Sequence, residues 1–396
     1  MINLLKKLMG RDTGSYSPLI TVEISKENLL HNLNQFRTLA PNGTIAPVLK
    51  SNAYGHGFLE IALILEKYGD VGKRNGNKGS AVHIPFFVVD SYYEACVLRK
   101  AGIKTAILVI GFTRPEIILS SRLRNTSFTI TSVDQLRGID STMHPLSIHL
   151  KIDTGMHRQG IMPHEVAEAL GIMEENRFLE LTGVCSHLAD ADNDDPSFTE
   201  SQVATWNKVV HQCKNFWPDI KYIHISNTDG HKFSTDTEAN VSRLGIGLYG
   251  LSQNETMQPK LDLMPVLEMK SIITGVKKLN MNESIGYSNT FHAEKEMLVA
   301  TIPVGYYEGV DRRLSNRGVV LVGKDRIPCP IVGRVSMNIT SIDVTSVPQA
   351  KMGTEVIVIS RVAGEQNSIA MMARKCDTIT YDIAVHIPAH LRRVVV

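Results

Sequence analysis

The strongest constraint on the fold is an alternation of short apolar runs with helical stretches over the first two-thirds of the chain. The apolar runs span 44–50, 84–90, 105–111, 127–131, 146–153, 181–187, 222–226 and 246–250. The stretches between them, such as 57–69, 91–102 and 162–176, repeat apolar residues at the helical period. Near-continuous apolar strands separated by helices are typical of a parallel sheet covered on both faces. About eight such units predict an α/β fold whose N-terminal part is a (β/α)8 TIM-type barrel.

An open, doubly wound sheet is the alternative that the same alternation allows. Proteins of that fold often carry the dinucleotide fingerprint G-x-G-x-x-G directly after their first strand. The residues that follow the run 44–50 do not match this fingerprint. The sequence therefore favours the closed barrel.

The pattern changes near residue 263. The segments that follow are β-rich, are separated by Gly, Asn, Asp and Pro turns, and span 267–280, 296–310, 317–334, 337–345 and 354–360. Because 396 residues exceed the ~250 to 300 at which one core stops growing, we expect two domains. We predict the barrel domain at 1–262 and a mostly antiparallel C-terminal β domain at 263–396. The polar, proline-bearing stretch 253–265 would form the seam.

The composition argues against several classes of function. The chain has 42 Lys and Arg against 40 Asp and Glu, with no basic block, which argues against nucleic-acid binding. No run approaches the ~20 apolar residues of a membrane-spanning helix. The five cysteines are widely spaced and show neither C-x-x-C nor zinc-ligand spacing. We therefore expect reduced thiols, no metal site and a cytoplasmic protein.

Polar and basic residues gather where the apolar runs end, and the function of a barrel lies at those ends. They are Lys50, Lys151, Asp153, Arg158, Ser186, His187, His224, Ser226, Asn227, Thr228, Arg243, Gly245 and Ile246. Each residue type has an ordinary structural explanation by itself: a solvated lysine, a hydrogen-bonded histidine, an ion-paired arginine. Together these residues predict a pocket for an anionic, ring-shaped ligand.

Lys50 suggests which ligand this is. A partly desolvated lysine near other cations can be a neutral amine at pH 7, and a neutral amine attacks an aldehyde to give a Schiff base. The aldehyde cofactor with a phosphate is pyridoxal 5'-phosphate (PLP), an electron sink for a carbanion at the α-carbon of an amino acid. Small residues in 227–230 and 244–247 would let the backbone approach its phosphate. Arg243 facing the pyridine nitrogen would keep that nitrogen unprotonated, which suppresses side reactions such as transamination.

A series of motifs appears in order along the chain: LKSNAYGHG, KIDTGMHRQG, CSHLADAD, HISNTDG, SRLGIGLYG, IGYSNTF, VGYYEGVDRR, GRVSMN and TITYDI. This series resembles that of the alanine racemases, which are barrel-type PLP enzymes with a C-terminal β domain. The resemblance covers about residues 18 to 385. Its most specific part is K-x-N-A-Y-G-H-G together with R-L-G-I-x-L-Y-G.

The resemblance implies roles for individual residues. Lys50 would bind PLP and act as one base, and Tyr287 would be the second base, since racemisation removes a proton from one face and returns it to the other. The other cofactor contacts would come from Tyr54, Arg158, His187, Asn227, Thr228, Arg243, Gly245, Ile246 and Tyr381. Lys151, which is carbamylated in many members of the family, would position Arg158. The substrate would meet Arg158 and the backbone N–H of Met337.

The resemblance also implies an assembly. In the family, the residues that match Tyr287 and Met337 belong to the partner subunit, so a homodimer with two shared sites is implied. Tyr306 and Arg312 match the residues at the family's entrance gate.

The chain departs from the family pattern near the expected site. Asn338 stands where Asp is usual, His157 where Gly is usual, Gln159 where an aliphatic residue is usual, and Tyr307-Glu308 where Ala-Asp is usual. The changes at 157 and 338 are those we expect to alter substrate choice or rate. Because Lys50 and Tyr287 are retained, we expect the activity class to persist.

These observations predict a PLP-dependent alanine racemase that interconverts L-alanine and D-alanine and supplies D-alanine for peptidoglycan. A racemase of serine, or of a broader range of amino acids, is the alternative on the same fold. A barrel-type decarboxylase of basic amino acids protonates the cofactor ring through an acidic residue, and Arg243 at that place argues against one. A non-enzymatic PLP-binding barrel would lack the second domain that carries Tyr287.

Overall fold

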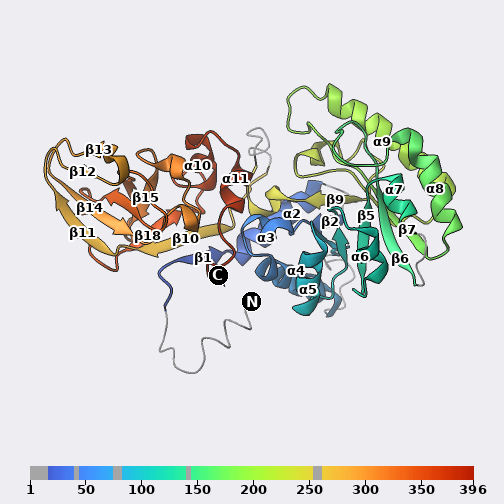
Figure 1. Cartoon of the computed structure of the whole chain (residues 1–396), viewed down its shortest axis with the longest axis horizontal. Helices are drawn as coiled ribbons and strands as arrows, with labels where there is room; N and C mark the ends of the chain where they lie inside the picture. The colour runs from blue at the N-terminus through green and yellow to red at the C-terminus, as the bar shows by residue number, and fades with distance from the viewer. Residues whose placement is uncertain (1–16, 40–43, 75–82, 140–143, 253–260) are drawn as a thin grey trace.

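The computed structural model describes residues 17–39, 44–74, 83–139, 144–252 and 261–396. Figure 1 shows two bodies along the long axis of the molecule, a helix-wrapped barrel on the right and a β-rich body on the left. The predicted α/β barrel followed by a mostly antiparallel β domain is confirmed. Within the described residues, no helix has the length and apolar content needed to cross a bilayer.

The barrel is built from parallel strands. They are β2 (Thr44–Pro47), β3 (Phe87–Val89), β4 (Ile107–Val109), β5 (Thr126–Ile130), β6 (Leu146–Lys151), β7 (Leu179–Cys185), β8 (Tyr222–His224) and β9 (Val241–Leu244). Strands β3 to β8 form one sheet in sequence order, and β2 pairs with β9. A bridge between Val48 and Val88 joins β2 to β3, and the Arg243 N–H donates to the Ser226 carbonyl at 3.1 Å, beyond the end of β8. These contacts close the sheet into a barrel.

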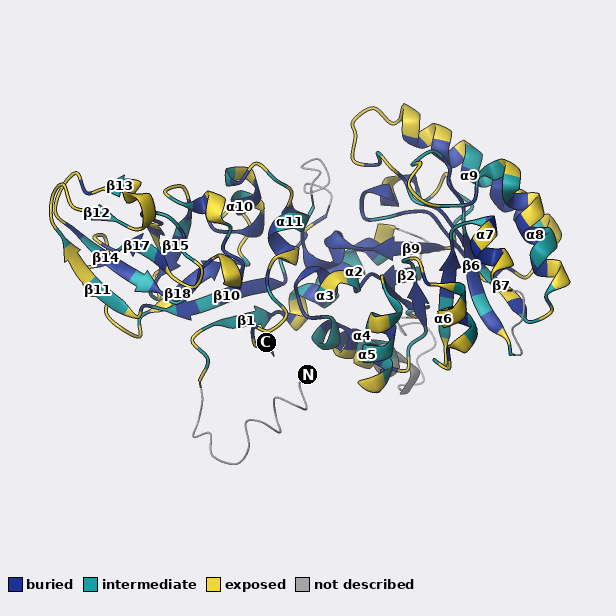
Figure 2. Cartoon of the chain, in the orientation of Figure 1, coloured by how far each residue is buried: buried dark blue, intermediate teal, exposed yellow. Residues whose placement is uncertain are grey.

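Amphipathic helices cover the outside of the barrel. They are α2 (Lys26–Leu39), α4 (Phe58–Arg74), α5 (Tyr92–Lys100), α6 (Pro115–Ser120), α7 (Val133–Arg137), α8 (Val166–Glu175) and α9 (Ser197–Phe216). Figure 2 shows exposed residues on their outer faces and buried residues toward the strands. In α2, Leu29, Leu33 and Phe36 are fully buried at the spacing of one helix face. The helices predicted between the apolar runs are confirmed as α4, α5 and α8.

The predicted position of the last barrel strand was wrong. The apolar pattern placed it at 246–250, but the strand is Val241–Leu244, and Ile246–Tyr249 forms a 3-10 helix, η3. The true strand escaped a search for apolar runs because it carries Ser242 and Arg243, both of which are buried. The spacing G-x-G-x-x-G does occur in this region, but it follows the last barrel strand rather than the first.

The C-terminal body combines two sheets, a hairpin and two short helices. The larger sheet has the order β16 (Ile327–Pro330), β15 (Val319–Val322), β18 (Glu355–Ile359), β10 (Leu267–Ile272), β1 (Thr21–Ile24) and β19 (Arg393–Val395). The smaller sheet has the order β11 (Gly275–Leu279), β14 (Met297–Ile302) and β17 (Thr340–Asp343). The hairpin joins β12 (Ser284–Ile285) to β13 (Phe291–His292), and the helices are α10 (Ile369–Lys375) and α11 (Thr380–Val385).

The first strand of the chain belongs to the C-terminal sheet. β1 pairs antiparallel with β10 and parallel with β19, although it precedes every barrel strand. Pairing between segments so far apart leaves no local signal in the sequence. The division into 1–262 and 263–396 stays a prediction, and β1 is a segment before residue 263 that joins the C-terminal sheet. The predicted seam at 253–265 lies largely outside the described residues.

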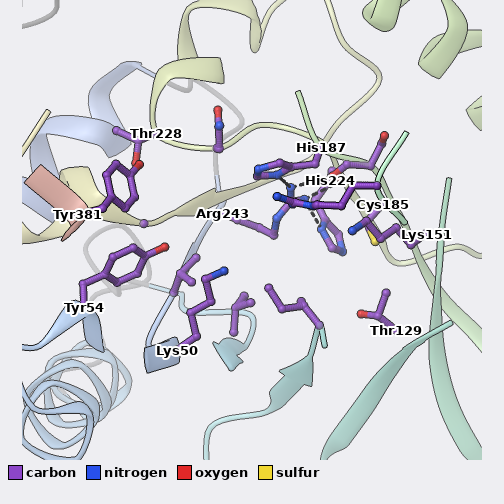
Figure 3. A pocket seen from close by; sticks show the side chains of 17 residues that line it. Lys50, Tyr54, Thr129, Lys151, Cys185, His187, His224, Thr228, Arg243 and Tyr381 are labelled. Carbon is purple, nitrogen blue, oxygen red and sulfur yellow. Dashed lines mark hydrogen bonds between the residues drawn. The ribbon is translucent and has the colours of Figure 1, made fainter. Parts of the chain in front are cut away.

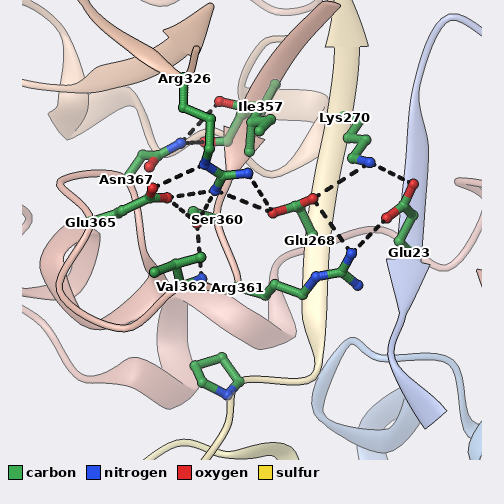
Figure 4. Close-up of polar contacts among 12 residues, drawn as sticks. Glu23, Glu268, Lys270, Arg326, Ile357, Ser360, Arg361, Val362, Glu365 and Asn367 are labelled. Carbon is green, nitrogen blue, oxygen red and sulfur yellow. Dashed lines mark hydrogen bonds and ion pairs between the residues drawn. The ribbon is translucent and has the colours of Figure 1, made fainter. Parts of the chain in front are cut away.

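A cluster of alternating charges ties β1 to this sheet (Figure 4). Its centre is Glu268 on β10, which is 3% exposed. Lys270, Arg326 and Arg361 surround the Glu268 carboxylate at 3.5, 3.4 and 3.9 Å. Lys270 and Arg361 also bind Glu23 of β1, at 2.8 and 3.2 Å. Because a buried carboxylate needs compensating partners, this cluster makes β1 an integral part of the C-terminal domain.

Replacing Glu268 by alanine should destabilise the fold. The change leaves Arg326 and Arg361 without the carboxylate that they share. We expect the free energy of unfolding to fall by roughly 3 kcal/mol, the lower end of the cost of breaking a buried ion pair, because the cations are partly exposed. Urea denaturation followed by circular dichroism measures this change.

The exposed ion pair between Lys278 and Glu296 provides the matched control. Because surface pairs contribute little, Glu296→Ala should lower the free energy of unfolding by less than ~1 kcal/mol. Equal losses in the two variants would contradict a special role for the buried cluster.

Candidate active site

A pocket opens at the carboxyl ends of the barrel strands, where α11 of the C-terminal domain meets the barrel. Its volume is about 220 Å³. The predicted site residues that line it are Lys50, Tyr54, Lys151, Arg158, His187, Asn227, Thr228, Arg243, Gly245 and Tyr381. Figure 3 shows Lys50 and Tyr54 reaching into the cavity from one side, with Arg243 and His187 across from Lys50. The structure therefore brings residues from both domains to one place.

Lys50 opens a strained turn directly after β2. The turn is the short helix α3 (Lys50–Tyr54), in which residues 51 to 54 have φ angles of 55°, 57°, 52° and 53°. The left-handed conformation costs roughly 1–2 kcal/mol for each non-glycine residue, so contacts from outside the turn must hold it. Strain of this kind collects at functional sites, where it fixes the direction of a side chain. The spacing of apolar residues gives no sign of this geometry.

Arg243 on β9 is a buried cation that carbonyls and histidines satisfy. It is 7% exposed. Its Nη1 donates to Nδ1 of His224 at 2.8 Å and to the carbonyl of the same residue at 3.0 Å. Its Nη2 donates to the Ser186 and Ile225 carbonyls, at 2.7 and 3.0 Å, and to Nδ1 of His187 at 3.0 Å. A guanidinium only donates, so both histidines must present an unprotonated Nδ1.

The histidines around Arg243 are therefore neutral. Burial, reinforced by the charge of Arg243, holds the pKa values of His187 and His224 well below the ordinary histidine value. With its proton on Nε2, His224 donates to Nδ1 of His149 at 2.8 Å. Burial also lowers the pKa of His149, to about 3. The chain of hydrogen bonds from Arg243 to His149 thus keeps one positive charge, on the arginine.

The pocket is cationic. Lys50, Lys151, Arg158 and Arg243 line it, and no carboxylate does within the described part of the chain. Burial lowers the pKa of Lys151, and the nearby charges of Arg158 and Arg243 lower it further. A concave surface of this composition attracts an anion.

Gly245 lines the pocket, and two hydroxyl groups suited to a phosphate lie close to it. A Cβ at this position would lie 2.8 Å from the Tyr54 hydroxyl and 3.8 Å from Oγ1 of Thr228. The ring of Tyr381 lies beside that of Tyr54, with 5.7 Å between the ring centroids. Burial raises the pKa of both tyrosines well above the ordinary value, so their hydroxyls remain hydrogen-bond donors. Hydroxyl donors around a glycine, where the backbone can approach closely, match what an oxyanion needs.

Some residues of the site differ from the sequence-based expectation. Ile246 is fully buried and does not line the pocket, so its predicted cofactor contact would involve its backbone and stays a prediction. Sequence reasoning missed Cys185 and Thr129, which line the pocket, and the role of His149. Each lies on a barrel strand, and a polar residue at an inward-facing strand position is the signal that could have found it.

Besides Ile246, four predicted site residues lie outside this pocket. They are Tyr287, Tyr306, Arg312 and Met337, all exposed on the C-terminal domain. Tyr287 is 68% exposed and Met337 is 55% exposed. The Tyr307 N–H donates to the Met337 carbonyl at 2.9 Å, which joins two of the exposed turns. We call the exposed apolar residues Tyr287, Tyr306, Tyr307, Met337 and Ile339 the C-terminal patch.

The departures from the resembled family have structural counterparts. His157 has a φ of +52°, a conformation that favours glycine, and its N–H donates to Oδ1 of Asp153 at 3.0 Å. Asn338 donates from Nδ2 to Oε1 of Glu308 at 2.6 Å. Glu308 is 6% exposed, and its Oε2 accepts the Gly305 N–H at 2.8 Å. An aspartate at 338 would repel this buried carboxylate, whereas the Asn338 amide donates a hydrogen bond to it.

The neutral state of His149 makes stability depend on pH. Its folded pKa of about 3 lies below the ~6.5 of an exposed histidine, so between these values the unfolded chain holds a proton that the folded chain lacks. As the pH falls below about 6.5, protonation of this histidine in the unfolded chain should lower the free energy of unfolding of the wild type by about 1.4 kcal/mol for each pH unit. In His149→Asn this contribution is absent. The stability difference between wild type and variant should thus narrow as the pH falls from about 7 to about 5, which urea denaturation at each pH measures.

Phe86, whose ring contacts His149, supplies the control. Phe86→Leu disturbs the same region without removing a titratable group, so its stability difference from wild type should be the same at every pH. If the stability difference between wild type and His149→Asn also stays the same at every pH, His149 does not change its protonation on unfolding.

Known proteins similar to this chain indicate the family to which it belongs. Residues 24–253 match the family model of the alanine racemase N-terminal domain, and residues 266–395 match that of the alanine racemase C-terminal domain. An alanine racemase of Methanococcus maripaludis is 32% identical over 383 residues, which cover 95% of this chain and 98% of that protein.

Solved structures agree with these matches. An alanine racemase of Clostridium difficile has a TM-score of 0.85 at 26% identity, with 96% of this chain and 97% of that chain covered. A histidine racemase of Leuconostoc mesenteroides has a TM-score of 0.82 at 23% identity, with 97% of this chain and 100% of that chain covered, and it shares the fold. The chain is a racemase, and it belongs to the alanine racemase family.

Proposed function

We propose that the protein is a PLP-dependent alanine racemase that interconverts L-alanine and D-alanine with Lys50 and the partner subunit's Tyr287 as its two bases. The observation that carries the proposal is the pocket. A lysine at the end of β2 faces a buried arginine across a cationic cavity whose lining, among the described residues, includes no carboxylate. The alanine racemases that the chain resembles support alanine as the substrate.

The side chains of the pocket fit PLP. The phosphate would lie against Gly245 and the hydroxyls of Tyr54 and Thr228, which line the pocket together. Oγ1 of Thr129 is buried on the pocket wall without a hydrogen-bond partner, as expected of a group that meets a bound molecule. Lys50 supplies the amine. When bound, PLP supplies an aldehyde that condenses with amines and a ring that withdraws electrons from the α-carbon.

Arg243 determines which chemistry the ring supports. A guanidinium donates hydrogen bonds and keeps its own protons, so a pyridine nitrogen that faces it would stay unprotonated. His187 and His224 hold this guanidinium in place. The decarboxylase alternative needs an acidic residue at this position, and the described lining of the pocket has none.

The two bases must lie on opposite faces of the α-carbon. Lys50 provides one of them. Tyr54 and Tyr381 are poor candidates for the other, because burial raises their pKa values and keeps them protonated. Tyr287 is 68% exposed and is therefore accessible to the pocket of a second copy.

A homodimer with shared sites follows from this assignment. The C-terminal patch exposes tyrosine, methionine and isoleucine side chains, and an exposed apolar patch is typical of a protein interface. In the dimer, the backbone N–H of Met337 and the side chain of Arg158 would bind the substrate. Lys151 would position Arg158, and Tyr306 and Arg312 would stand at the entrance.

A racemase of serine, or of a broader range of amino acids, is the second candidate. The observation that favours it is the changed pair Glu308 and Asn338, which lies directly beside Met337. The fold is also that of a histidine racemase.

The wider role that we propose is the supply of D-alanine for peptidoglycan in the cytoplasm. A cytoplasmic location is supported by Cys185, Cys213, Cys329 and Cys376, which are buried as free thiols.

Mixing two inactive variants tests the shared site. Lys50→Ala lacks one base and Tyr287→Phe lacks the other, so each alone should lose at least ~100-fold in α-proton exchange. When the two chains are produced together, random pairing makes about half of the dimers mixed, and each mixed dimer holds one intact site. About a quarter of the wild-type rate should then return. Exchange in D₂O, followed by NMR with L-alanine, L-serine and L-histidine in parallel, measures the rates and ranks the substrates.

Lys50→Ala mixed with Arg243→Ala is the matched control. Both changes lie in the barrel pocket, so no mixed dimer regains an intact site and no activity should return. Failure of the first mixture, although both variants are folded and dimeric, would refute the shared site. A wild-type enzyme that binds PLP but exchanges none of the three amino acids would refute the proposed activity.

A further inference from the structure

The strained turn after Lys50 is held at both ends by side chains from other parts of the molecule. At its start, the Ser51 N–H donates to Oε1 of Glu94 at 2.8 Å. At its end, the Gly55 carbonyl accepts hydrogen bonds from Nη2 and Nε of Arg393, at 2.6 and 3.3 Å. Glu94 comes from α5 of the barrel, and Arg393 comes from β19 of the C-terminal sheet.

Glu94 is shared between this turn and a helix. Its Oε2 accepts the N–H groups of Asp90 and Ser91, at 2.7 and 3.2 Å, and Oγ of Ser91 accepts the Glu94 N–H at 3.2 Å. These bonds form the capping box that begins α5. The other carboxylate oxygen remains for Ser51. One carboxylate therefore joins the end of β3 to the turn that carries the lysine.

Arg393 is itself fixed by its own domain. Its Nη1 donates to the Pro388 and Leu391 carbonyls at 3.0 and 2.9 Å. Its side chain lies over Gly57, where a Cβ would come within 2.5 Å of the arginine Cδ. The guanidinium thus reaches Gly55 as a donor with a set position, and the C-terminal domain holds it there.

These contacts matter because residues 51 to 54 all lie in the left-handed region. A turn in a disfavoured conformation persists only while its surroundings over-determine it. Lys50 is the first residue of this turn, so relaxation of the turn would change the direction in which its amine points. Glu94 and Arg393 do not line the pocket, and the turn is the segment that both of them contact.

We propose that Glu94 and Arg393 are positioning residues that hold the left-handed turn and so aim the Lys50 amine into the pocket. The inference rests on the proposed function in one respect, which is that Lys50 is the amine that binds PLP. It gives the C-terminal domain a role in the pocket of its own chain, in addition to the role proposed for Tyr287 in the pocket of a second copy.

Removing either contact tests this role. In the full chain, Arg393→Ala and Glu94→Ala should each weaken PLP binding by about tenfold or more, the usual cost of losing a positioning contact behind a ligand-binding group. Each should also shift the pH dependence of the visible absorbance of bound PLP. In the PLP-free protein, each should change the rate at which an amine-selective reagent labels Lys50 by about threefold or more, as mass spectrometry of the Lys50 peptide would show. This labelling needs no racemase activity, so it separates failure of this inference from failure of the proposed function.

The double variant makes the test sharper. Because both contacts hold the same turn, their effects should not multiply. The PLP affinity of the double variant should be only about two- to threefold lower than that of the single variant that binds PLP less tightly. If the fold losses of PLP affinity in the two single variants multiply in the double variant, the two residues act independently. That result would overturn a shared role in positioning Lys50.

Two controls separate positioning from a general loss of stability. Arg392→Ala changes the exposed neighbour of Arg393, and Ser91→Ala removes a helix cap while leaving the Ser51–Glu94 bond in place. Both should keep the wild-type PLP affinity. If Arg393→Ala does not fold, Arg393→Lys still offers one donor to Gly55 and should show a smaller effect of the same kind. The proposal would be overturned if the variants at 94 and 393 have lower melting temperatures but keep the wild-type PLP affinity, absorbance profile and Lys50 labelling rate.

Discussion

The mouth of the barrel is organised around a buried guanidinium whose N–H groups need hydrogen-bond acceptors. Arg243 is 7% exposed, and a charge at that depth is tolerated only where carbonyls and aromatic nitrogens surround it. The ends of β7 and β8 supply them through Ser186 and Ile225. The same requirement fixes the tautomers of His187 and His224, because an imidazole that accepts from arginine must be neutral. This one side chain thus links the ends of two strands to both histidines and contributes to the positive charge of the pocket.

The second domain is part of the same machinery. The first strand and the last strand of the chain both lie in the C-terminal sheet, so the barrel is an insertion between two segments of that sheet. The charged cluster around Glu268 secures the first of these strands. The last one carries Arg393, which reaches the end of the Lys50 turn. Tyr381 of α11 joins the lining of the pocket. Each chain thus uses its C-terminal domain to complete its own pocket, and the C-terminal patch stays exposed as the proposed contact with a second copy.

The departures from the family fall into two kinds. At positions 308 and 338, where the family usually has two aspartates, this chain has a buried carboxylate and an amide that donates to it, so one negative charge beside Met337 is removed. His157 has no such partner, and it occupies a left-handed position that glycine would adopt without strain. The first kind preserves the scaffold around a proposed substrate contact. The second stores strain directly beside Arg158, where a change in rate or specificity would originate.

The sequence by itself determined the barrel, the β-rich second domain and most of the pocket, because periodicity and strand-end chemistry are local signals. Lys50, the small residues around 227–230 and the arginine at 243 could be named from such patterns. Tertiary structure alone decided the last barrel strand, whose buried Ser242 and Arg243 hide it from a search for apolar runs. It also decided that β1 pairs with β10, that residues 51 to 54 are left-handed, and that Glu94 and Arg393 hold them there. These features depend on contacts between segments far apart in the chain, and such contacts leave no mark on the spacing of neighbouring residues.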